Sequence, residues 1–104
     1  MSHELCEKIG GLASRVNNAA VHSTGSESRQ LLEIQDRFAK LQLVAIVKDL
    51  QAEHNDYKAA VKGLNEAIDF IGDATEKINN VAKAIKLTAK AAELVEKAIK
   101  SAAA

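Results

Sequence analysis

VAKAIKLTAKAAELVEKAIKSA, residues 81–102, is the stretch that decides the fold, because its apolar and charged side chains separate at the period of an α-helix. With successive residues placed 100° apart, the charged side chains fall on one arc of about 140°. The opposite arc, of about 180°, is apolar except for one hydroxyl, and such a helix needs a packing partner in water. The apolar arc holds Val81, Ala84, Ile85, Leu87, Thr88, Ala91, Ala92, Leu94, Val95, Ala98 and Ile99.

The composition of the whole chain agrees with a helical fold. The chain has 104 residues, no proline and only 3% aromatic residues, and its commonest residues are good helix formers. A chain of this length closes one modest hydrophobic core. We therefore expect a single all-α domain over residues 1–104, built as an antiparallel helical hairpin or a bundle of three or four helices.

The first helix is expected over residues 3–19, with one narrow apolar stripe at steps of four and three residues. Gly10 and Gly11 interrupt this stripe and together cost about 2 kcal/mol relative to alanine. Small polar residues then predict a linker over residues 20–25. The stripe consists of Leu5, Ile9, Leu12 and Val16.

The second helix is expected over residues 26–53, and its apolar face changes along its length. Leu31, Ile34, Phe38, Leu41 and Ala45 share one stripe, but the apolar residues of the second half point more than about 100° away. The segment LQLVAIV, residues 41–47, is therefore apolar nearly all round. Two explanations remain open: burial among helices of one chain, or burial in an oligomer. The second set consists of Leu43, Ile46, Val47 and Leu50.

The third predicted helix, residues 56–101, follows a turn at Glu53 to Asp56 and carries a heptad pattern typical of a coiled coil. The unbroken register favours one continuous or bent helix. The alternative is a break at Gly72-Asp73, where a glycine stop precedes a capping residue. Residues spaced seven apart are Tyr57, Leu64, Ile71, Ile78, Ile85, Ala92 and Ile99, with Val61, Ile68, Thr75, Ala82 and Ala89 between them.

Catalytic and cofactor-binding motifs do not occur in the sequence. It contains no phosphate-binding glycine loop, no paired-cysteine metal motif, no zinc-protease motif and no nucleophile elbow. The acidic ridge of Glu66, Asp69, Asp73 and Glu76 shares its arc with lysines, as a solvated helix face does. We expect no enzyme activity, no metal, no cofactor and no small-molecule substrate.

The expected function is interaction. The protein is predicted to bind itself, as a homo-oligomer, or another helical protein through surplus apolar surface. The alternative is a membrane-active protein, surface-binding or pore-forming, whose lysine-rich amphipathic last helix lies on anionic lipid. A formal net charge of 0 argues against nucleic acid. Candidate interface residues are Leu41, Leu43, Val44, Ile46, Val47, Leu50, Leu87 and Leu94.

The expected compartment is the cytoplasm. A single cysteine, Cys6, fits a reducing environment. The sequence begins without a basic region followed by an apolar core, the pattern of a signal peptide. Export without a leader sequence stays an alternative, because it requires no signal peptide.

Overall fold

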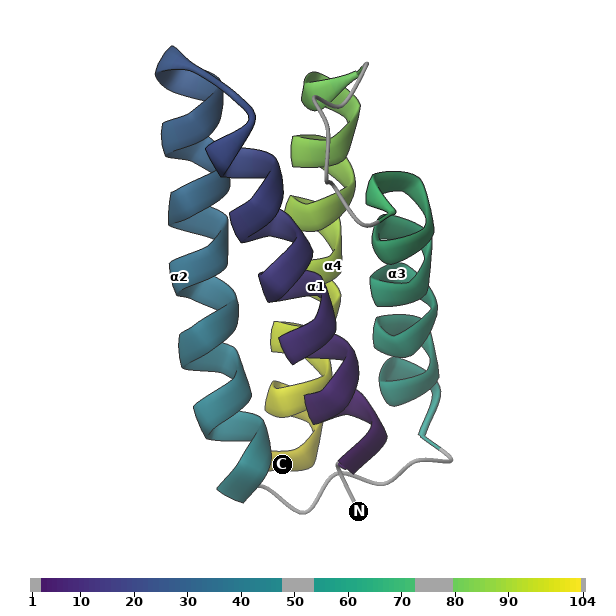
Figure 1. The fold of residues 1–104 in the computed structure, drawn as a ribbon. Coiled ribbons are helices and arrows are strands. Elements are labelled where there is room, and N and C mark those ends of the chain that lie inside the picture. The colour runs from purple at the N-terminus through teal and green to yellow at the C-terminus, as the bar shows by residue number, and fades with distance from the viewer. Residues whose placement is uncertain (1–2, 48–53, 73–79, 104) are drawn as a thin grey trace.

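The computed structural model describes residues 3–47, 54–72 and 80–103, and in them four helices pack side by side (Figure 1). This confirms the prediction of an all-α fold built as a helical bundle. The principal extents of the molecule are 40 × 20 × 18 Å. The helices are α1 (His3–Val21), α2 (Gly25–Val47), α3 (Asn55–Ile71) and α4 (Val81–Ala103).

The four helices form a square in which each helix packs on two others. α1 packs on α2 and α3, and α4 packs on the same two helices, so that α1 and α4 are diagonally opposed. Two antiparallel hairpins, α1 with α2 and α3 with α4, therefore lie against each other. The first turn of α1 and the last turn of α4 lie at the same end of the bundle (Figure 1).

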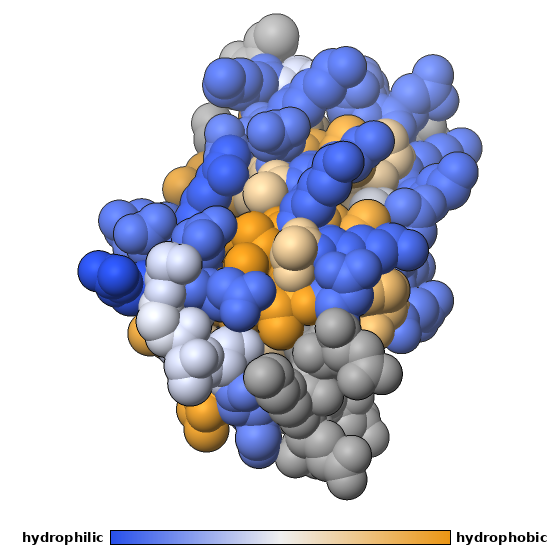
Figure 2. All heavy atoms as spheres, turned by 90° about the horizontal axis from the view of Figure 1, so that it is seen from above, coloured by the Kyte–Doolittle hydropathy of each residue, from blue (hydrophilic) through white to orange (hydrophobic). Residues whose placement is uncertain are grey.

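The core lies where the four apolar stripes meet. The predicted stripe of α1 is fully buried, and Leu31, Ile34, Phe38 and Ala45 of α2 are buried with it. Leu41, the remaining member of the α2 stripe, is half-buried and packs against this core. Seen from above in Figure 2, hydrophobic residues gather mainly in the middle of the view and hydrophilic side chains surround them.

The continuous helix expected over residues 56–101 is wrong, because α3 ends at Ile71. Gly72 takes a φ of 62° and a ψ of −144°, a conformation with positive φ that glycine reaches without a steric cost. Its N–H donates to the Ile68 carbonyl oxygen at 2.9 Å. A new helix starts at Val81, where the Asn80 side chain accepts the N–H of Lys83 at 3.0 Å. The break lets the two halves bury their apolar faces on each other.

The residues buried between α3 and α4 also differ in part from the predicted heptad positions. In α3 the buried set includes Ala60 and Ala67, whereas Val61 and Ile68 are only half-buried. In α4, Ile85 and Ile99 lie at the flank and Ala82 is exposed. Small side chains occupy the centre because they let the two helix axes approach closely, and the larger ones cover the edges. The buried residues of α4 are Val81, Ala84, Thr88, Ala91, Ala92, Val95 and Ala98.

The remaining helix bounds differ by a few residues from the predicted ones. α1 continues to Val21, so the linker expected over residues 20–25 is shorter, and Gly25 already begins α2. α2 is described to Val47, and the end predicted at Glu53 lies outside the described residues. α3 is capped by His54, whose Nδ1 accepts the N–H of Asp56 at 3.1 Å.

Candidate interaction surface

The second half of α2 carries apolar side chains on two opposite sides. On the inner side Ala45 is fully buried and Leu41 packs against the core. Gln42 also faces inward, and its Nε2 donates to the Cys6 carbonyl oxygen of α1 at 3.0 Å. The only polar side chain of the segment 41–47 is therefore held by the neighbouring helix.

The other side of this segment is exposed. The exposed fractions are 69% for Leu43, 39% for Val44, 61% for Ile46 and 79% for Val47. We call these four residues the outer α2 face. Aliphatic side chains that are scattered singly over a surface need no explanation, but a cluster on one helix end is typical of an interaction site.

The four other predicted interface residues are not part of this face. Leu41, Leu87 and Leu94 are half-buried and pack against the core. Leu94 fits into the space left by a glycine: a Cβ built on Gly63 would lie 2.6 Å from Leu94 Cδ1. Leu50 lies outside the described residues.

Leu87 and Leu94 do border a small groove between α3 and α4. The groove has a volume of about 190 Å³. Its lining combines apolar side chains with two lysines and one glutamate. The groove is smaller than a typical small-molecule pocket. We therefore interpret it as part of the packing contact between α3 and α4. It is lined by Ala59, Lys62, Gly63, Glu66, Leu87, Lys90 and Leu94.

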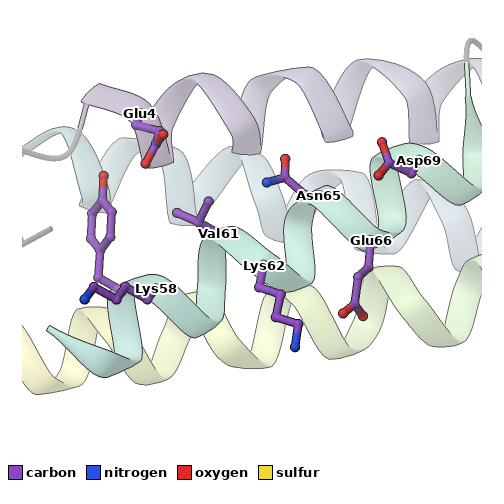
Figure 3. A pocket seen from close by; sticks show the side chains of 8 residues that line it. Glu4, Lys58, Val61, Lys62, Asn65, Glu66 and Asp69 are labelled. Carbon is purple, nitrogen blue, oxygen red and sulfur yellow. The ribbon is translucent and has the colours of Figure 1, made fainter. Parts of the chain in front are cut away.

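A larger groove runs between α1 and α3, with a volume of about 400 Å³ (Figure 3). In Figure 3, Asn65 and Asp69 lie on the α1 side of α3, whereas Lys62 and Glu66 point the other way. The groove thus carries both signs of charge and only one aliphatic side chain, Val61. It is lined by Glu4, Tyr57, Lys58, Val61, Lys62, Asn65, Glu66 and Asp69.

Tyr57 lines this groove and is itself a structural residue. Its hydroxyl oxygen accepts the backbone N–H of Leu5 at 3.2 Å. Burial raises the pKa of Tyr57, the hydrogen bond from Leu5 lowers it, and the negative charge of Glu4 raises it again. A phenol held neutral by burial and bonded to backbone is a tether between helices.

The charged residues of α2 that lie next to the outer α2 face form ion pairs with other residues of the protein. Arg37 Nε donates to Glu96 Oε1 at 2.6 Å, which links α2 to α4. Lys40 Nζ lies 3.0 Å from Asp36 Oδ2, one turn away on the same helix. The nearest charges on α2 are therefore engaged in pairs, and the outer α2 face itself is uncharged.

Neither metal binding nor membrane crossing finds a structural basis in the described residues. In ranges 3–47, 54–72 and 80–103, no group of three or more His, Cys, Asp and Glu residues could hold a metal ion. None of the described helices is long and apolar enough to cross a membrane. Comparison of the chain with protein-family models, with curated proteins and with solved structures gives no match.

Sequence reasoning missed several features that shape this surface. Val21 and Leu32 are also exposed, at 72% and 46%, but they lie far along the helices from the outer α2 face. The cap at Asn80 had a signal in the sequence, since asparagine is a preferred N-cap residue. The cap at His54 had none, because histidine is not among those residues.

Proposed function

We propose that this protein is a non-enzymatic interaction protein that binds a helical partner, either itself or another protein, through the outer α2 face. The observation that carries the proposal is the exposure of Leu43, Ile46 and Val47 on the side of α2 that faces away from its buried stripe. α2 buries its opposite stripe in the bundle, so these side chains have no part in closing the monomer core. Removing them from water is favourable for any partner that offers an apolar surface.

The shape of the surface favours a helical partner. The outer α2 face is a convex strip on one helix, and amphipathic helices pack along such strips through residues at steps of three and four. A concave pocket, as small molecules require, does not occur on it among the pockets described. Cytoplasmic residence belongs to the same proposal and is supported by the single cysteine.

The membrane-active alternative has less support. It requires the apolar arc of α4 to lie in lipid, but Ala84, Ala91 and Val95 are fully buried in the bundle. α4 would expose this arc only if the bundle opened. The lysines of α4 alone give a solvated face, which is the ordinary outer side of an amphipathic helix.

Two measurements on the full chain test the proposal. Sedimentation velocity gives the mass over a range of concentrations, and the fluorescence of an apolar dye such as anilinonaphthalene sulfonate reports open apolar surface. We expect the wild type either to self-associate or to bind the dye as a monomer. Ile46→Glu should reduce whichever signal is present by more than half, with unchanged helicity by circular dichroism.

Val21→Glu is the matched control, because Val21 is similarly exposed but lies at the end of α1. This variant should keep the mass and the dye signal of the wild type. A monomer whose dye binding is the same in wild type and Ile46→Glu would contradict the proposal. Loss of helicity in Ile46→Glu would contradict it too, because it would place Ile46 in the core.

A further inference from the structure

The segment 41–47 of α2 carries more apolar surface on its outer side than on its inner side. Leu41 and Ala45 face the core, and one of these two is only an alanine. The outer α2 face consists of one leucine, one isoleucine and two valines, all exposed. Because the free energy of burial grows with apolar area, this segment taken alone would gain more by turning its outer side inward. Its own apolar side chains therefore do not explain the orientation that it adopts.

One polar contact ties this segment to the neighbouring helix. Gln42 Nε2 donates to the carbonyl oxygen of Cys6 in α1 at 3.0 Å. Gln42 is half-buried, and within residues 41–47 it has the only side chain that can donate a hydrogen bond. If the segment turned about its axis, this amide would leave α1 and bond to water instead. The contact with Cys6 therefore belongs to one orientation of the segment.

Gly10 leaves the space in which this contact forms. In an α-helix the carbonyl oxygen of Cys6 accepts the N–H of Gly10, four residues later, so the two groups are neighbours. A Cβ built on Gly10 would lie 2.9 Å from Gln42 Nε2, closer than two such atoms come without a shift. The glycine of α1 thus opens a backbone carbonyl to a side chain of α2. This gives a reason for a glycine within α1, where alanine would favour the helix more.

We propose that the Gly10–Gln42 contact is a positioning device that keeps the outer α2 face turned outward. Leu31 and Phe38 set the orientation of the first half of α2, because both are fully buried. Gln42 extends that orientation over residues 41–47. In coiled coils a single polar side chain fixes the register of a helix in the same way. The inference concerns which side of α2 the protein presents, and it holds whether or not a partner binds there.

Gly11, the next residue of α1, has a different contact and supplies the matched control. A Cβ built on Gly11 would lie 3.3 Å from Arg15 Nη1, a side chain of the same helix, and would not meet Gln42. Arg15 Nη1 donates to the Gly11 carbonyl oxygen at 3.0 Å. Alanine at residue 10 or at residue 11 raises the helix propensity of α1 alike. Of the two, only Gly10→Ala displaces the Gln42 amide.

Solvent exposure of single methyl groups tests the proposal on the full chain. It is measured by NMR as line broadening by a soluble gadolinium chelate, at a concentration where sedimentation shows a monomer. In the wild type the Ile46 methyl groups should broaden strongly and the Ala45 methyl group weakly. Gly10→Ala should lower the first effect and raise the second, each by about twofold or more, as the orientations exchange. Gly11→Ala should keep the wild-type pattern.

Gln42→Glu gives a second test, because it keeps the shape of the side chain and removes the donor. An ionised carboxylate only accepts hydrogen bonds, so at neutral pH this variant should broaden like Gly10→Ala. At about pH 4 a carboxyl group regains a proton that it can donate. The pattern should then move back toward that of the wild type at the same pH. A change of packing alone would not produce this pH dependence.

Wild-type exposure of Ile46 and Ala45 in both Gly10→Ala and Gln42→Glu at neutral pH overturns the inference. The same change in Gly11→Ala overturns it too, because the effect would then follow from helix propensity. An equal rise for the methyl groups of Leu31 would show general unfolding and likewise contradict a local device. Failure of the proposed function is read separately, from the mass and the dye binding of the wild type.

Discussion

The backbone N–H of Leu5 donates a hydrogen bond of 3.2 Å to the hydroxyl oxygen of Tyr57. Leu5 lies in the first turn of α1, where backbone N–H groups have no partner within the helix. Tyr57 lies in the first turn of α3. One side chain thus satisfies a buried donor and fixes the relative position of the two hairpins at one end of the bundle.

Replacing Tyr57 by phenylalanine should leave the N–H of Leu5 buried without its acceptor. A buried donor that loses its partner costs about 1 to 3 kcal/mol of stability. Urea denaturation followed by circular dichroism should show this loss with an unchanged slope. A loss below about 0.5 kcal/mol would mean that water replaces the phenol oxygen at this position.

Alkaline pH should destabilise the protein through the same residue. Burial raises the pKa of Tyr57 above its ordinary value of about 10. The folded state therefore favours the neutral phenol, and its stabilisation is full below about pH 10 and lost as pH rises through the folded-state pKa. Tyr57 is the one tyrosine of the chain, so the phenolate absorbance reports its titration directly.

The control for the alkaline prediction is Tyr57→Phe, whose stability should depend less on pH in this range. A phenolate transition at or below about pH 10 in the folded protein would contradict the prediction.

Replacing Gly72 by alanine should destabilise the bundle by about 1 to 3 kcal/mol, since a φ of 62° with a ψ of −144° is a backbone conformation essentially open to glycine alone. The sign of this change in stability is informative, because in a continuous helix Gly72→Ala would stabilise the protein by about 1 kcal/mol. Thermal or urea unfolding of the variant measures it. Gly72→Asn should lose about as much as Gly72→Ala, because at a ψ of −144° the residue lies outside the left-handed helical region that asparagine tolerates.

The two sides of α2 should respond differently to truncation. Leu31→Ala removes a fully buried side chain and should cost about 2 to 5 kcal/mol. Leu43→Ala removes a side chain that is 69% exposed and should change monomer stability by less than about 0.5 kcal/mol. Urea denaturation at low protein concentration compares them. An equal loss in both variants would place Leu43 in the monomer core.

The spacing of apolar residues along the sequence predicted burial correctly for helices that pack on their neighbours with one face only. The stripes of α1 and of the first half of α2 were predicted residue by residue, because their partners lie on one side. The exposed set Leu43, Ile46 and Val47 was also separated correctly from the buried stripe. Whether that set lies inside one bundle or on its surface depends on which sides of α2 are covered by α1 and α4, and the periodicity of α2 alone does not contain this information.

By itself the sequence determined that the chain is helical and which arc of residues 81–102 turns away from water, because both follow from side-chain chemistry at a period of 3.6 residues. Only the tertiary structure decided that the helix breaks at Gly72 and that alanines form the centre of the α3–α4 seam. A helix stays continuous or folds back according to which choice buries more apolar surface. That balance depends on all four helices together.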